Sequence, residues 1–290
     1  MRKTLTCITK CIRLWGYRKH IGSRMLGLCV HAAAALTVTV LGFLVVYIMV
    51  RGIPNLRPSL FAWEYTSDNQ SMLPAMINTC TMTVISLLLA VPFGVGAAIY
   101  LQEYARRGSA ITKVTQITTQ TLSGIPSIVY GLFGMLMFGG ALGMGYSLIS
   151  GALTLAMMIL PLIMRTTQEA LSSVPDLYRE GSYGLGAGKL RTVFSVVLPS
   201  AAPGILSGVI LAIGRIAGET AALMYTSGTV AKIAGPGDSG ATLALHMYKQ
   251  ASEGLYLNEA YATSVVLLAV VLAINFCADR AAKLITKGRG

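Results

Sequence analysis

Long hydrophobic segments alternate with short polar ones along most of the chain. A helix needs about 20 mainly apolar residues to cross the hydrocarbon core of a bilayer, and these segments are close to that length or longer. The pattern therefore predicts an all-α membrane protein with six transmembrane helices. The predicted spans are residues 26–50, 71–102, two within 114–164, 201–225 and 259–278.

The stretch between Lys113 and Arg165 holds 51 residues without a charge. A single helix of this length would run about 75 Å, far beyond a hydrocarbon core of roughly 30 Å. Two spans must therefore lie within it, the second at residues 147–164. A glycine cluster at positions 139, 140, 143 and 145 is the predicted outer turn between them.

The first of these two spans is unusually polar. Residues 115–127 are rich in Thr, Gln and Ser and contain Gly124-Ile125-Pro126. A helix interrupted there would expose backbone groups, which membrane proteins tolerate only beside protein or water. Two interpretations stay open: a segment that lines a transport pathway, and simple helix packing through small polar residues.

The distribution of basic residues sets the topology. Eighteen of the 23 Lys and Arg residues fall in the tails and loops that alternate spans place inside, and four fall in the outer loops. Lys and Arg favour the cytosolic side, so both termini are predicted to be cytosolic. This placement also accounts for the net charge of +12 without a nucleic-acid partner.

Composition supports the same class of protein. The chain is 54% hydrophobic and only 12% charged, with a mean hydropathy of +0.66, whereas an average soluble domain is about 25% charged. No cysteine lies in an outer loop, so no disulfide framework is implied, and Cys7 and Cys11 lack the partner ligands of a zinc site.

We divide the chain into four parts. These are a basic cytosolic segment (1–25), the first transmembrane helix with its external loop (26–70), a five-helix core (71–280) that includes a cytosolic loop at 166–200, and a cytosolic tail (281–290).

Residues 180–199 form a polar, glycine-punctuated stretch between two hydrophobic segments. Residues 182–185 are expected to make one helical turn, Gly186 and Gly188 to reverse the chain with positive φ, and residues 189–197 to begin a second helix. The small residues would let a partner approach this elbow closely, while Glu180, Lys189 and Arg191 supply orienting charge. The alternative is an ordinary loop between two membrane helices.

Gly188-Lys189 invites comparison with a phosphate-binding P-loop. That motif needs glycine at position 183 and Ser or Thr at 190, where this chain has Tyr183 and Leu190. The chain therefore lacks this device for binding ATP.

The fifth predicted span contains two charged residues, Arg215 and Glu219. They are four residues apart, so a continuous helix would place them on one face, directed inward. A charged residue at membrane depth is costly and commonly functional. Arg215, Glu219 and the neighbouring Thr220 are therefore candidate residues of a substrate pathway, and a purely structural ion pair is the alternative.

The spacing within residues 180–199 resembles the cytosolic loop of binding-protein-dependent ABC importer permeases. That loop reads E-A-A, three residues, G, nine residues and I-x-L-P. Gly181 and Ser182 stand for the two alanines and Val196 for the isoleucine. The resemblance implies a type I ABC importer permease fold and docking of an ATPase, through Glu180, Gly181, Ser182, Gly186, Leu198 and Pro199.

Residues 122–134 and 210–228 resemble permeases of phosphate importers, most closely the PstA type. The resemblance covers roughly residues 70–280. It implies a channel-forming subunit in a bacterial inner membrane that passes phosphate inward by alternating access. It also implies a PstC-type partner permease, two PstB-type ATPase subunits that bind ATP-Mg, an external PstS-type phosphate-binding protein, and no cofactor in this chain.

Other functions remain open. Arginine recognises oxyanions generally, so molybdate, sulfate or phosphonate is the next candidate substrate after phosphate. A stand-alone channel or a secondary transporter would explain the topology and the charged pair but not the loop spacing. An intramembrane enzyme is disfavoured because no nucleophile and base occur at a credible spacing.

Overall fold

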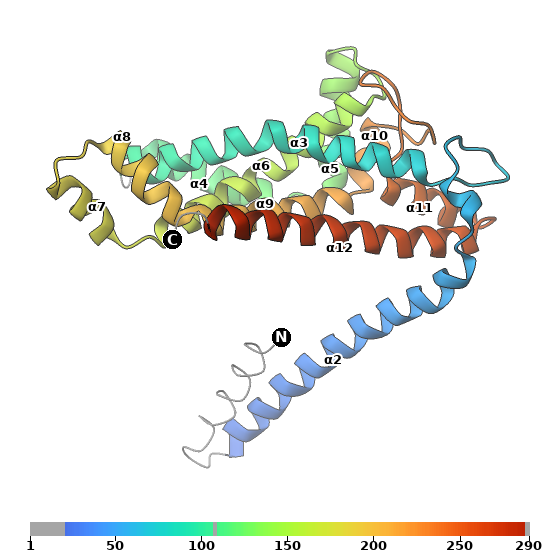
Figure 1. The fold of residues 1–290 in the computed structure, drawn as a ribbon, viewed down its shortest axis with the longest axis horizontal. Helices are drawn as coiled ribbons and strands as arrows, with labels where there is room; N and C mark the ends of the chain where they lie inside the picture. The colour runs from blue at the N-terminus through green and yellow to red at the C-terminus, as the bar shows by residue number, and fades with distance from the viewer. Residues whose placement is uncertain (1–20, 107–108, 288–290) are drawn as a thin grey trace. The chain divides into compact units, whose positions relative to one another are not determined.

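The computed structural model describes residues 21–106 and 109–287, and every regular element within them is helical (Figure 1). Contacts divide the chain at Val50 into two units, and each is described by itself. The first unit holds most of α2 (Ile21–Gly52), which includes the predicted first span. The predicted basic segment, with Cys7 and Cys11, lies almost entirely outside the described residues.

The second unit is built around four long helices. They are α3 (Leu73–Ile99), continued by the π-helical turn η4 (Tyr100–Tyr104); α6 (Leu148–Ser172); a series formed by α8 (Lys189–Thr192), η6 (Val193–Val197) and α9 (Leu198–Ala217); and α12 (Leu257–Lys287). Shorter elements are η2 (Ile53–Asn55), η3 (Pro58–Phe61), α7 (Asp176–Gly184), α10 (Ala221–Thr226) and α11 (Leu243–Glu253). With α2, five described helices are long and apolar enough to cross a membrane.

The third predicted span, the first of the two within residues 114–164, is a broken helix. It consists of α4 (Ala110–Ser123), followed by α5 (Ser127–Gly134) with its continuation η5 (Met135–Ala141), and the two parts meet at 102°. The break falls at residues 124–126, as the glycine and proline there predicted, since proline lacks a backbone donor and disfavours a helical residue before it. The outer turn is also where it was predicted, with positive φ at Gly143 and Gly145.

Close packing of α3 against α6 forms the centre of this unit. A β-carbon on Gly94 would lie 2.9 Å from the Ile163 side chain, and one on Gly151 would lie 2.8 Å from Met82. Ser86 donates a hydrogen bond to the backbone oxygen of Ala152. Glycine at these positions lets the two helices approach closely, which is typical of helix packing in membranes. The two helices are therefore held together along much of their length.

The predicted external loop after the fifth span is attached to the outer end of α3 by Asn78. The Asn78 amide donates to the backbone oxygens of Lys232 (2.8 Å) and Ala241 (3.1 Å), and its oxygen accepts from the Ala234 N–H (3.0 Å). The side chain is buried, and both ends of its carboxamide are hydrogen-bonded. This loop is therefore fixed to the helical core.

A short helix, α11, follows in this external segment and ends at Gly254, which adopts the left-handed conformation. His246 of this helix is buried, packs edge-on against the Tyr65 ring and hydrogen-bonds the Gln70 backbone. Its Nε2 atom is buried without a hydrogen-bond partner among the described residues. Burial lowers the pKa of His246 to about 4.

We expect the protein to lose stability on mild acidification through His246. The unfolded imidazole, with a pKa near 6.5, binds a proton that the folded one rejects, so stability is complete above pH 6.5 and falls towards pH 4. At pH 5 the loss amounts to about 2 kcal/mol. Melting curves of the purified protein at pH 7 and pH 5 measure it. His246→Phe keeps an aromatic ring and should flatten the dependence; an unchanged slope in that variant would assign it to other groups.

Candidate docking site and substrate pathway

The elbow between α7 and α8 differs from the predicted one in where its first helix begins and in which glycine reverses the chain. The first helix begins at Asp176 rather than Ser182, because Pro175 and an acidic residue in the first turn favour a helix start there. Glu180, Gly181 and Ser182 thus lie within α7. Gly186 has φ +82°, as predicted, and reverses the chain. Gly188 was wrongly predicted to do the same: its φ is −71°, and it is the residue that precedes α8.

Hydrogen bonds across the elbow fix its two arms. The backbone N–H groups of Gly186 and Ala187 donate to the oxygens of Tyr183 (2.9 Å) and Ser182 (3.1 Å). The Ser182 hydroxyl lies 2.8 Å from the hydroxyl of Thr192, which is fully buried in the second arm. Ser182 therefore joins the two helices, a role that its small size alone did not indicate.

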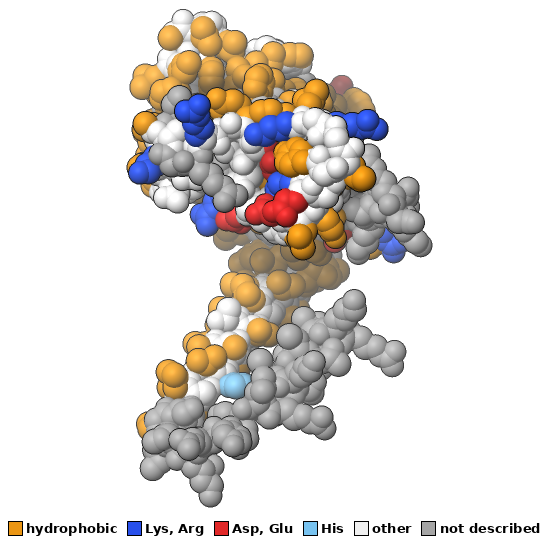
Figure 2. All heavy atoms as spheres, turned by 90° about the vertical axis from the view of Figure 1, so that its left-hand side faces the viewer, with side chains coloured by type: hydrophobic (Ala, Val, Ile, Leu, Met, Phe, Trp, Pro, Cys, Tyr) orange, Lys and Arg blue, Asp and Glu red, His pale blue; other side chains and the backbone are white. Residues whose placement is uncertain are grey.

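Large apolar side chains are exposed around this elbow. Leu185, immediately before the reversal, is 91% exposed, and Leu177 on α7 is 75% exposed. Figure 2 looks onto this end of the molecule, where basic and acidic side chains surround apolar ones. Exposed apolar groups ringed by polar ones mark protein interaction sites. These residues were not among the predicted docking residues, although leucine and tyrosine in an otherwise polar loop were a visible signal. The group comprises Leu177, Tyr178, Tyr183, Leu185 and Leu190.

Leu198 and Pro199 do not belong to this exposed group. Both are partly buried at the start of α9, and Leu198 packs on a cluster that includes Leu171, Val193 and Val197. They seat the second arm on the helical core, so their contribution to docking is indirect.

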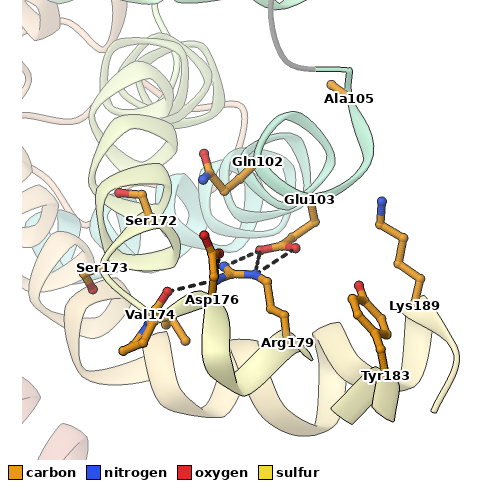
Figure 3. A pocket seen from close by; sticks show the side chains of 11 residues that line it. Gln102, Glu103, Ala105, Ser172, Ser173, Val174, Asp176, Arg179, Tyr183 and Lys189 are labelled. Atoms are coloured by element: carbon orange, nitrogen blue, oxygen red, sulfur yellow. Dashed lines mark hydrogen bonds and ion pairs between the residues drawn. The ribbon is translucent and has the colours of Figure 1, made fainter. Parts of the chain in front are cut away.

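Arg179 anchors α7 from its inner side. Its guanidinium bonds Glu103 on η4, with Nη2 to Oε1 at 2.7 Å, and the pair is largely buried (Figure 3). The hydrogen bond to Glu103, followed by the charges of Glu103 and Asp176, raises the pKa of Arg179 against the opposing effect of burial. Both residues line a polar cleft of ≈ 460 Å³ together with Gln102, Ser172 and Lys189. No sequence motif singles out Glu103 or Arg179.

The predicted fifth span ends earlier than expected, which changes the geometry of its charges. The helix stops at Ala217, and Gly218, a poor helix residue, follows it. Arg215 lies in the last helical turn, where its charge favours the helix dipole, and its side chain is exposed. Glu219 lies beyond the helix and is 9% exposed. The predicted shared helix face for these two residues is therefore wrong.

Glu219 instead caps the next helix. Its carboxylate accepts a hydrogen bond from the Ala222 N–H at 3.2 Å, at the start of α10. Thr220 is the residue preceding that helix and is partly buried. Within the part of the chain that the structure describes, no ion pair joins Arg215 to Glu219. The acid thus has its own structural role at the start of α10.

One side chain bridges the break in the broken helix. The Tyr130 hydroxyl donates to the Leu122 oxygen at 2.9 Å across the break. Polar groups at membrane depth face a protein partner or water. On α4, before the break, exposed polar side chains occupy two sides of the helix: Gln116, Gln120 and Ser123 share one face by helical spacing, and Thr118 and Thr121 lie on the opposite one.

Comparison with known proteins places this chain among transport components. Residues 90–289 match the family described as binding-protein-dependent transport system inner membrane component. The chain is 36% identical over 215 residues to the probable ABC transporter permease protein YqgI of Bacillus subtilis (strain 168), covering 72% of this chain and 70% of that protein.

A second relative is the phosphate transport system permease protein PstA 1 of Mycobacterium tuberculosis (strain ATCC 25618 / H37Rv). It is 40% identical over 154 residues, which are 53% of this chain and 49% of that protein, so the match spans about half of its length. Among solved structures, a bacterial alginate ABC transporter in complex with an alginate-bound periplasmic protein has a chain of the same fold. The TM-score is 0.66 at 16% identity, over 91% of this chain and 98% of the other.

Proposed function

Because this chain belongs to the binding-protein-dependent transport system inner membrane components, we propose that it is the channel-forming subunit of an ATP-driven phosphate importer. The exposed apolar elbow, with Leu185 at its tip, is the observation that carries the proposal. It is a docking surface for a second protein, and its motif spacing is that of permeases that dock an ATPase. The similarity to PstA-named relatives supports phosphate as the substrate.

In this proposal the energy comes from partner subunits. Two PstB-type ATPases bind ATP-Mg and close on the elbow, and this chain contributes no nucleotide site. A PstC-type permease covers the exposed Arg215, so that the two chains enclose the pathway. A PstS-type protein delivers phosphate from outside to a multi-pass complex in a bacterial inner membrane.

Arg215 meets the anion in this pathway. Its planar guanidinium can offer two parallel hydrogen bonds to an oxyanion. Arg215 is the only Lys or Arg in the predicted spans, and a single cation holds an anion less tightly than several would, which favours release. The same chemistry fits sulfate, molybdate or phosphonate, and competition of each anion with radiolabelled phosphate uptake separates these substrates.

Leu185→Cys is expected to crosslink to the ATPase subunit in membranes, because the native side chain projects from the elbow. The background chain should have its five native cysteines replaced. Ala251→Cys on α11, at the opposite end of the long helices, is the matched control and should give no such crosslink (Figure 1).

Labelling of intact spheroplasts by a membrane-impermeant maleimide provides the topology check. Ala251→Cys should react from outside and Leu185→Cys should not. External labelling at position 185 without a crosslink would overturn the docking proposal.

A further inference from the structure

The docking helix α7 has little apolar attachment to the rest of the chain. None of its residues is fully buried, and Leu177, Tyr178 and Tyr183 are exposed. Its position is therefore set mainly by polar contacts. Those on its inner side converge on Arg179, while Ser182 holds its far end to Thr192.

All five N–H groups of the Arg179 guanidinium are used. Nε and Nη2 donate to the Glu103 carboxylate, and the second Nη2 hydrogen is donated to the Leu171 oxygen at 3.0 Å. The Nη1 group donates to the Val174 oxygen (2.9 Å) and to Asp176 (3.1 Å). One side chain thus joins α3, the end of α6, the intervening turn and α7. Lysine has three donors without a planar fork and could not make the same set.

Burial distinguishes this pair from the other ion pairs on the same side. The side chains of Arg179 and Glu103 are 14% and 6% exposed, whereas those of Arg165 and Glu169 are 59% and 63% exposed. Exposed ion pairs contribute little to stability, whereas removing one partner of a buried pair leaves an uncompensated buried charge. The contact between α7 and α3 therefore resists separation.

The end of α3 is shaped for this contact. Its last turn is π-helical, with the Ala105 N–H bonded to the Tyr100 oxygen five residues back. A π-helical turn shifts the residues that follow it around the helix axis and often marks a functional position. Here it coincides with Glu103, whose carboxylate faces the docking helix (Figure 3).

We propose that the Glu103–Arg179 pair positions the docking helix and makes α3 follow the movement of α7 during the ATP cycle. The inference rests on the proposed docking of an ATPase at the elbow. Because α3 is packed along α6, displacement of α7 moves both helices together. Neither residue contacts substrate or nucleotide; the pair acts through the placement of α7.

The test uses the complete transporter in proteoliposomes and measures inorganic phosphate transported per ATP hydrolysed. Glu103→Gln and Arg179→Gln should each lower this ratio about tenfold, with ATP hydrolysis retained, because each removes the charge-assisted hydrogen bonds that hold α7 to the end of α3. Arg179→Lys should also lower the amount of phosphate transported per ATP hydrolysed, because lysine lacks the planar fork. The matched control, Arg165→Gln, breaks the exposed pair and should leave the ratio unchanged.

A double-mutant cycle separates a coupled pair from two independent residues. If the pair acts as a unit, Glu103→Gln combined with Arg179→Gln should be no worse than Arg179→Gln alone. The inference would be overturned if the two single effects on the ratio multiplied in the double variant, or if either single variant had a normal ratio. Crosslinking through Leu185→Cys, made in each variant, keeps the two proposals distinct. A retained crosslink with a normal ratio rejects only the positioning role, whereas no crosslink in the unaltered background rejects the docking function.

Discussion

Gly186→Leu is expected to reduce phosphate uptake at least tenfold while the protein still inserts into the membrane. Gly186 adopts φ +82°, and the left-handed region costs a residue with a β-carbon roughly 1–2 kcal/mol. No atom of this chain lies within 4 Å of a β-carbon placed there, so the new side chain would project outward. It would therefore meet the docking partner rather than disturb the core. Uptake and ATP hydrolysis, each normalised to the amount in membranes, are the measurements.

Two companion variants separate backbone strain from bulk at the elbow. Gly186→Ala adds strain with little bulk. Gly188→Leu adds bulk without strain, because Gly188 has an ordinary φ of −71° and open space around it. Equal defects in Gly186→Ala and Gly186→Leu would assign the effect to the reversal itself. Normal uptake by Gly186→Leu would remove the argument that the elbow is closely covered by another protein.

Substitution of Arg215 is expected to have the second large effect on phosphate uptake. Arg215→Lys keeps the charge but loses the planar fork, and should lower phosphate uptake about tenfold at unchanged assembly. Arg215→Gln loses the charge as well and should lower uptake about 100-fold, in line with roughly 3 kcal/mol for hydrogen bonds to a charged group. The measurement is uptake normalised to assembled complex.

The position of Glu219 makes a double variant of Arg215 and Glu219 a useful control for the role of Arg215. Because Glu219 caps α10, Arg215→Ala combined with Glu219→Ala should not restore uptake, as it would if the two residues formed only a structural ion pair. Glu219→Gln retains an oxygen that can accept the Ala222 N–H and should be mild. Full normalised uptake by the double variant would assign Arg215 to the scaffold.

Local chemistry explains which features could be predicted from the sequence. The spans, the break at residues 124–126 and the reversal at Gly186 follow from uncharged length, from proline and from glycine, each of which acts on its own segment. The end of α9 was harder, because Gly218 is tolerated inside many membrane helices and gives no decisive signal. The four-residue spacing of Arg215 and Glu219 then suggested a shared face that the interruption removes.

Contacts between residues far apart in the sequence could not be predicted from it. Glu103 and Arg179 are 76 residues apart, and nothing in either local stretch indicates the other. Their pairing depends on how α3 packs against α6 and on the π-helical turn at the end of α3. The exposed leucines and tyrosines of the elbow were visible in the sequence, but their exposure is a property of the fold.

The attachment of Asn78 has a consequence for the order of biosynthesis. Its partners at Lys232 and Ala241 lie 154 and 163 residues further along the chain. At 5–20 residues per second they leave the ribosome about 8 to 30 s after Asn78 does. Until then the carboxamide lacks the bonds that satisfy it in the finished fold. A chain truncated before residue 232 never acquires them, so the outer end of its α3 lacks the attachment that this loop provides.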